Sequence, residues 1–70
     1  MKTIQAWIAR DKDDTLWLYL SEPIKARTQW VCSFGSTSPH LINEVNFPNV
    51  KWEDEEPTEV EVTIKVKQHE

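Results

Sequence analysis

Few side chains in this sequence have the chemistry that catalysis requires. Cys32 is the only cysteine, and His40 follows it along the chain. Catalytic cysteines commonly pair their thiol with a histidine base. Here no neighbouring basic group in the sequence would activate the Cys32 thiol. Trp30, Cys32 and Phe34 alternate as on one face of a strand. This spacing favours a buried structural cysteine.

Metal and phosphate chemistry are poorly supported. Cys32, His40 and His69 supply three of the four ligands of a usual structural zinc site, and no two of them are closely spaced. Gly35 is the only glycine, so the glycine-rich phosphate loops of nucleotide-binding proteins are excluded. The sequence therefore predicts no cofactor.

The aspartate-rich segment 11–14 invites a calcium interpretation. Counted from Asp11, Glu22 stands at the twelfth position of an EF-hand loop, where a bidentate glutamate is expected. Leu16, however, occupies the sixth position, where the sharp turn needs glycine. Residues 16–20 alternate like a strand, so we expect a hairpin here and no metal site.

The other carboxylates gather near the C-terminal end of the chain. They offer a docking surface for a basic partner, a cation site, or an acidic decoy that imitates nucleic-acid phosphate. The simpler interpretation is a solvated loop and strand face that discourages unwanted edge pairing. Half of the twelve acidic residues belong to this candidate acidic surface: Glu53, Asp54, Glu55, Glu56, Glu59 and Glu61.

The elements that position these groups must belong to a small domain. A chain of 70 residues forms one domain, 1–70, and buries only about 60% of its unfolded surface. With one cysteine it has no internal disulfide. Aromatic packing by four Trp, one Tyr and two Phe, or self-association, must compensate.

Charge and hydropathy exclude several classes of function. The net charge of −4 opposes nucleic-acid binding, which needs a basic surface. No segment approaches the roughly 20 apolar residues of a membrane span, and the N-terminal residues do not resemble a signal peptide. The lone cysteine is typical of a reducing compartment. We therefore expect a cytoplasmic protein.

Strict alternation makes the C-terminal segment the clearest strand. Residues 59–67 place Val60, Val62, Ile64 and Val66 on one face and polar residues on the other. Residues 3–9 and 15–20 predict a hairpin. A three-residue loop at 11–13 would put Ile8 opposite Leu16 and Trp7 opposite Trp17, and Asp14 stands where a hairpin turn often has glycine.

The middle of the chain is expected to be mixed. Residues 28–34 predict a third strand, and 50–52 a short fourth one. Ser38 and Pro39 resemble a helix start, and Phe47-Pro48 a stop, which predicts a helix of about two turns. The predicted fold is mainly β, bordering on α+β, with a small antiparallel sheet of four to five strands and one short helix.

The predicted core follows from these faces. It comprises Ile4, Ala6, Ile8, Leu16, Leu18, Leu20, Trp30, Cys32, Phe34, Leu41, Ile42, Val45, Phe47, Val50, Trp52, Val60, Val62, Ile64 and Val66. The first hairpin then has large apolar groups on both faces. Its second face carries Trp7, Trp17 and Tyr19, which either pack beneath the helix or the 23–28 loop or form a candidate partner-binding surface.

Six short phrases resemble a group of small uncharacterised proteins of gut bacteria that are often associated with prophage-like or mobile elements. The phrases are Ala6-Trp7, Ala9-Arg10-Asp11, Leu16-Trp17-Leu18-Tyr19, Glu22-Pro23, Phe47-Pro48 and Trp52-Glu53. In that group the first turn often ends in Asp-Gly, whereas Asp14 stands here. The resemblance implies a cytoplasmic accessory protein and supplies no activity or site residues.

Three hypotheses for function follow. The leading one is a non-enzymatic protein–protein interaction module that uses the aromatic hairpin face or an open sheet edge to bind another protein or a second copy of itself, as a homodimer. The second is the acidic decoy of a nucleic-acid-binding protein. The third is a small enzyme or metal-binding protein, motivated only by Cys32, His40 and the carboxylates.

Overall fold

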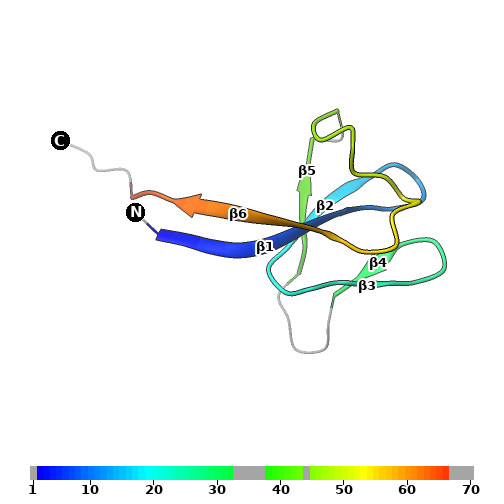
Figure 1. The fold of residues 1–70 in the computed structure, drawn as a ribbon, viewed down its shortest axis with the longest axis horizontal. Coiled ribbons are helices and arrows are strands. Elements are labelled where there is room, and N and C mark those ends of the chain that lie inside the picture. The colour runs from blue at the N-terminus through cyan, green and yellow to red at the C-terminus, as the bar shows by residue number, and fades with distance from the viewer. Residues whose placement is uncertain (1, 33–37, 44, 67–70) are drawn as a thin grey trace.

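The computed structural model describes residues 2–32, 38–43 and 45–66. Its larger sheet has four antiparallel strands in the order β5-β2-β1-β6. The six strands are β1 (Lys2–Arg10), β2 (Leu16–Tyr19), β3 (Ile24–Lys25), β4 (Trp30–Val31), β5 (His40–Ile42) and β6 (Thr58–Ile64). Strands β3 and β4 form a separate two-stranded sheet, which lies close to the β1–β2 end of the larger sheet (Figure 1).

The fold is mainly β, as predicted, but the predicted helix is wrong. Residues 40–42 form strand β5, and no helix occurs in the part of the chain that the structure describes. Trp17 lies opposite Leu41 in the ladder between β2 and β5. An isolated helix of two turns is marginal, whereas pairing with the open edge of β2 satisfies the same backbone groups.

Strands β1 and β2 meet in a register two positions away from the predicted one. Trp7 lies opposite Tyr19, and Ile8 opposite Leu18. The predicted pairs Ile8–Leu16 and Trp7–Trp17 are therefore wrong, although each residue keeps its predicted face because the shift is even.

The turn explains this shift. Asp11 N–H donates to Thr15 O (2.8 Å) and Asp14 N–H donates to Asp11 O (2.9 Å), so three residues form the tip one position later than predicted. Asp14 takes the left-handed conformation with φ of 73°, which a three-residue hairpin loop requires at its end. Aspartate tolerates this conformation better than most residues.

The other predicted strands are shorter than expected or absent. Of residues 28–32, the described part of the predicted 28–34 strand, only Trp30 and Val31 are in a strand, and β3 arises where a loop was expected. The segment 50–52 forms no strand; it belongs to a loop that passes from one face of the sheet to the other. Phe34 lies outside the described residues.

The sheet has an aliphatic and an aromatic face. On the aliphatic face Ile8, Leu16 and Val50 form a buried cluster, against which Leu18, Ile42 and Val60 pack. On the aromatic face Ala9, Tyr19 and Trp30 are buried, with four half-buried residues around them: Trp7, Trp17, Cys32 and Trp52.

The predicted core is confirmed in part. Ala6, Ile8, Leu16, Trp30 and Val50 are buried. Ala9 and Arg10 are also buried but were not predicted to be; Tyr19 is buried as well, in agreement with the alternative in which its face packs beneath another segment. Six residues predicted to be buried are exposed: Leu20, Leu41, Val45, Phe47, Ile64 and Val66.

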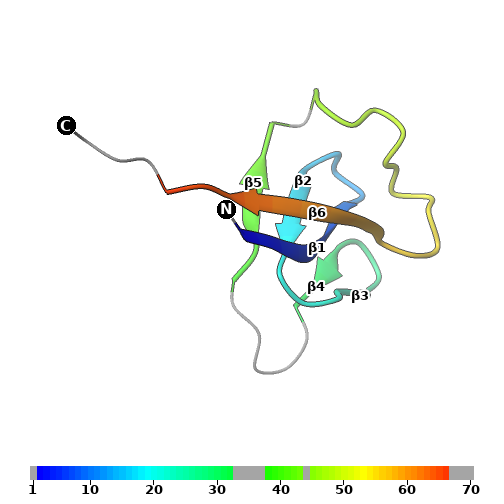
Figure 2. The ribbon, with the colours of Figure 1, turned by 60° about the vertical axis from the view of Figure 1, so that its left-hand side comes forward.

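Beyond the end of β2, β1 and β6 continue as a two-stranded ribbon, here called the arm. It consists of residues 2–5 and 61–66, with Gln5 opposite Glu61 and Thr3 opposite Thr63. The arm extends away from the rest of the sheet (Figures 1 and 2). The remaining described residues are called the body.

Candidate functional site

The aromatic face, for which the sequence left packing and a partner surface as alternatives, is largely part of the core. Tyr19 is 3% exposed, and its hydroxyl donates a hydrogen bond to Trp30 O (3.2 Å). Burial raises the pKa of Tyr19 well above its ordinary value of 10.0, and the charge of Asp11 adds to the shift. Trp7 and Trp17 are half-buried and pack against the buried cluster of Ala9, Tyr19 and Trp30.

Asp11, once considered as a calcium ligand, joins the first turn to this hairpin. Its carboxylate accepts a hydrogen bond from Trp30 N–H (2.8 Å), and Trp30 Nε1 donates to Arg10 O (3.2 Å). Burial raises the pKa of Asp11 above its ordinary value of 3.8, opposed by the bond from Trp30 and supported by the charge of Asp13. The carboxylate therefore has a structural partner.

Asp13 and Asp14 do not complete a metal site. Asp13 Oδ1 accepts a hydrogen bond from Thr15 N–H (3.0 Å), and the bonds with Thr15 lower the pKa of Asp13. Asp14 contributes its backbone carbonyl to Arg10. The described residues contain no group of three or more histidine, cysteine or carboxylate side chains able to hold a metal ion.

Arg10 is the buried charge that sequence reasoning missed. It is 8% exposed and donates hydrogen bonds to four backbone carbonyls. Nε contacts Val50 O at 2.7 Å, and Nη1 contacts Asp14 O at 2.9 Å. Nη2 contacts Asn46 O and Phe47 O, both at 3.2 Å. The guanidinium therefore fastens residues 46–50 over the aliphatic face, because its fork of donors reaches several acceptors at once.

Phe47 adopts a backbone conformation that this contact supports. Its φ is 57°, in the left-handed region that costs a residue with a Cβ roughly 1–2 kcal/mol. Its carbonyl accepts from both Arg10 and Val50 N–H (3.0 Å). The side chain is 48% exposed, so hydrogen bonding rather than ring burial holds the turn.

Lys25 fastens the continuation of the same loop on the aromatic face. Nζ donates to Trp52 O (2.6 Å) and Asp54 O (2.8 Å). It also lies 4.3 Å from the centroid of the Trp52 ring and 5.7 Å from that of Trp30. Such cation–π contacts attract an ammonium to the ring face. Arg10 and Lys25 thus hold one loop on opposite faces of the sheet.

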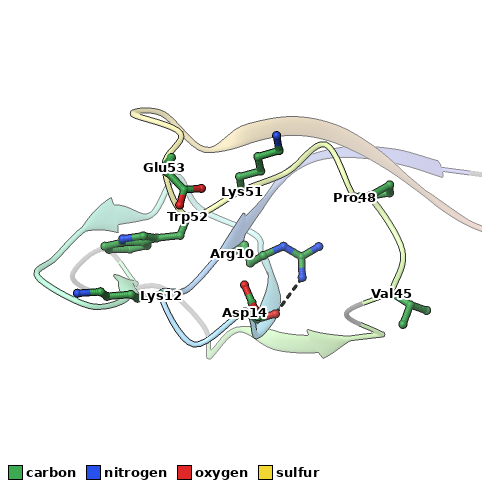
Figure 3. A pocket seen from close by; sticks show the side chains of 8 residues that line it. All are labelled: Arg10, Lys12, Asp14, Val45, Pro48, Lys51, Trp52 and Glu53. Atoms are coloured by element: carbon green, nitrogen blue, oxygen red, sulfur yellow. Dashed lines mark hydrogen bonds between the residues drawn. The ribbon is translucent and has the colours of Figure 1, made fainter.

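An open groove of about 560 Å³ lies beside the Arg10 contacts. In Figure 3 the Arg10 guanidinium lies among the labelled side chains with its bond to Asp14, while Lys51 points away. The charged side chains that line the groove are of both signs, and the N–H groups of Arg10 already donate to backbone carbonyls. The groove therefore lacks the convergent polar groups of a specific ligand site. It is lined by Arg10, Lys12, Asp14, Val45, Pro48, Lys51, Trp52 and Glu53.

The nucleophile–base pair considered from the sequence is not assembled. Cys32 packs with the aromatic cluster, whereas His40 lies opposite Leu18 in the ladder. Leu18 packs on the aliphatic cluster. The two residues therefore lie on different faces of the sheet, and a base must lie within hydrogen-bond reach of its nucleophile.

The candidate acidic surface is divided between a loop and a strand. Glu53, Glu55 and Glu56 are exposed in the loop that precedes β6. Asp54 is half-buried, and its carboxylate accepts a hydrogen bond from Lys51 N–H (3.0 Å). Glu59 and Glu61 lie on β6 opposite Trp7 and Gln5. The six carboxylates therefore do not form one continuous patch on a single element.

The arm combines an open strand edge with exposed aliphatic side chains. Strand β6 is an edge strand of the sheet, and β2 pairs with β1 only from Trp7 onward. Two of its aliphatic side chains are exposed: Ile64 to 48% and Val66 to 81%. An open strand edge beside apolar side chains is a template for pairing with another strand.

No protein-family model, no curated protein and no solved structure matches this chain. The resemblance of its short phrases to proteins of gut bacteria therefore stays a prediction. Within the described residues, no helix is both long and apolar enough to cross a membrane.

Proposed function

We propose that this protein is a non-enzymatic protein–protein interaction module that binds through the open strand edge of its arm. The observation that carries the proposal is the exposure of Ile64 and Val66 beside the edge strand β6. Small sheet proteins usually cover, shorten or twist such an edge. An edge left open supports strand addition, in which main-chain hydrogen bonds provide affinity and alternate side chains provide specificity.

Polar side chains of the body support the same proposal, because they are engaged in hydrogen bonds within the protein. Tyr19, Arg10 and Lys25, the groups that could engage a ligand, bind backbone carbonyls of the protein itself. Cys32 and His40 lie on different faces. These contacts favour the arm over the aromatic hairpin face as the proposed interaction surface.

Site-specific crosslinking in the producing cell tests the proposal. A photoreactive amino acid is placed at Thr63 on the arm and, as a matched control, at Glu55 in the exposed loop of the body. We expect discrete crosslinked protein products from position 63 and none from position 55. Equal products from both positions, or none from position 63, would contradict an arm-based interaction module.

A further inference from the structure

The outward polar face of the arm carries charges that complement themselves under a two-fold rotation. Glu61 lies opposite the neutral Gln5 in β1, and Thr63 opposite Thr3. Lys65 follows on the same face, because side chains alternate along an extended chain. A Glu and a Lys placed equally far on either side of Thr63 are exchanged when an antiparallel strand is rotated about Thr63.

We propose that the occupant of the open β6 edge is β6 of a second copy of this chain, paired antiparallel with Thr63 on the two-fold axis. This inference rests on the proposed function and names its partner. In this register Glu61 of each copy faces Lys65 of the other. On the opposite face, Val62 faces Ile64 and Val60 faces Val66. The pairing covers both exposed aliphatic side chains and joins two sheets into one.

Other registers satisfy these groups less well. A slip of one residue sends the aliphatic side chains to the wrong face. Centring the pair on Val62 keeps a Glu59–Lys65 contact but leaves Val66 opposite Thr58. Centring it on Glu61 places two like charges opposite each other, which is destabilising. Only the register centred on Thr63 pairs every aliphatic residue of the segment with another one and Glu61 with a cation.

The β6 edge fits a second copy better than the other open edge of the arm. The free part of β1, residues 2–5, is shorter than β6 and contains Lys2 but no acidic residue. Pairing β1 of one copy with β6 of another would be heterologous and would leave edges for continued growth. Pairing β6 with β6 is isologous, so the assembly closes at two copies.

The shape of the molecule is compatible with this pairing. The body lies at the Thr58 end of β6, and the arm extends away from it (Figure 1). In an antiparallel pair centred on Thr63, the second body lies beyond the far end of the first arm. The two bodies are therefore kept apart, and contact is made by the arms alone.

Charge reversal tests both the partner and the register. The full-length chain is studied by sedimentation velocity at low salt as wild type, Glu61→Lys and Lys65→Glu, and as a mixture of the two variants. Glu55→Lys, an identical charge change in the exposed loop of the body, is the control. Tryptophan fluorescence and thermal unfolding confirm that each variant is folded.

We expect wild type and Glu55→Lys to sediment at twice the chain mass of 8.3 kDa. In a dimer of either arm variant alone, positions 61 and 65 of opposite copies carry the same charge. We therefore expect its dimer dissociation constant to rise by about tenfold or more. Mixing the two variants pairs two positive sites with two negative ones and should restore the dimer. Amides of residues 59–64 should exchange more slowly in the dimer than in dilute protein.

Three outcomes would overturn the inference. The first is a monomeric wild type at high protein concentration. The second is a dimer that Glu61→Lys does not weaken, and the third is a variant mixture that fails to associate. Crosslinking from position 63 then separates the two proposals: capture of a different protein would retain the interaction module and reject the second copy, whereas no capture would reject both.

Discussion

The two ends of the long strand β1 differ in their neighbouring strands and in their burial. From Trp7 to Arg10 it pairs with β2, and Trp7 and Ile8 also pair with β6; Ile8 and Ala9 are each 2% exposed. From Lys2 to Gln5 it pairs with β6 alone. Burial is therefore decided by what surrounds a strand, and alternation alone does not supply it.

In the body, two cationic side chains as well as apolar packing hold the loop against the sheet. A domain of this size has little apolar surface to bury, and Arg10 and Lys25 fasten a loop of irregular backbone by binding its carbonyls. These bonds satisfy carbonyl acceptors that burial removes partly or wholly from water. Among the described residues no such loop covers the arm (Figure 1), which leaves its edge available.

The largest expected effect comes from replacing Arg10. Arg10→Met keeps much of the side-chain volume but removes the donor to four backbone carbonyls, and the buried bond to Val50 O is among those lost. We expect the free energy of unfolding to fall by about 3 kcal/mol, because buried unsatisfied groups cost about 1–3 kcal/mol each. Urea unfolding followed by tryptophan fluorescence measures the change. Arg27→Met, at an exposed position, is the control, and an equal loss there would refute the role given to Arg10.

Truncating one aliphatic residue in each region compares their packing directly. Leu16 is fully buried at 0% exposure, whereas Ile64 is 48% exposed. We expect Leu16→Ala to destabilise the dilute protein by about 2–3 kcal/mol, in line with cavity formation in a core. Ile64→Ala should cost less than about 1 kcal/mol, since it leaves no enclosed cavity. Similar losses in denaturant titrations would show that the arm is packed like the body.

Two lysines allow the cation contacts to be compared. Lys25→Met removes the bonds to the Trp52 and Asp54 carbonyls and the cation–π contact. We expect a loss of about 1–2 kcal/mol in thermal or urea unfolding. Lys65→Met, on the arm, should change the stability of the dilute protein by less than about 0.5 kcal/mol. If the two variants were equally stable, the loop would not depend on Lys25.

The smallest effect is a pH dependence that originates in the first turn. Because the pKa of Asp11 is raised in the folded protein from 3.8, the folded state binds this proton more tightly than the unfolded state does. The contribution of Asp11 to stability therefore increases as pH falls through its raised pKa toward 3.8 and is lost as pH rises.

Asp11→Asn isolates this contribution. The free energy of unfolding of the wild type, measured relative to the variant, should be higher near pH 4 than at pH 7. Asp13, whose pKa is lowered, should give the opposite trend in Asp13→Asn. A difference between wild type and Asp11→Asn that does not vary with pH would show that burial does not perturb Asp11.

Part of the fold was predictable because it depends on local geometry. The alternation in residues 59–66 and in both strands of the hairpin correctly assigned Ile8, Leu16 and Val60 to one face. The left-handed residue of the turn, Asp14 with a φ of 73°, was not predicted, because the loop was placed at 11–13. The register was not predictable, because loops starting at neighbouring positions preserve the same faces.

The candidate site was less accessible to sequence reasoning. Tyr19 belonged to an apolar face, but nothing local indicated that a second hairpin would cover it and accept its hydrogen bond. Arg10 occupied an aliphatic-face position by alternation, next to Ile8 two residues earlier, and that position was the available signal for its burial. Its acceptors come from residues 46–50, far along the chain.

The sequence by itself determined the strand character of the chain ends, the two faces of the hairpin and the self-complementary charges around Thr63. These follow from the two-residue period of extended backbone, which each segment carries alone. Only the tertiary structure decided that residues 40–42 pair as a strand, that Arg10 and Lys25 bind loop carbonyls, and that the arm stays uncovered. Those outcomes depend on which distant backbone groups remain to be satisfied once the strands have met.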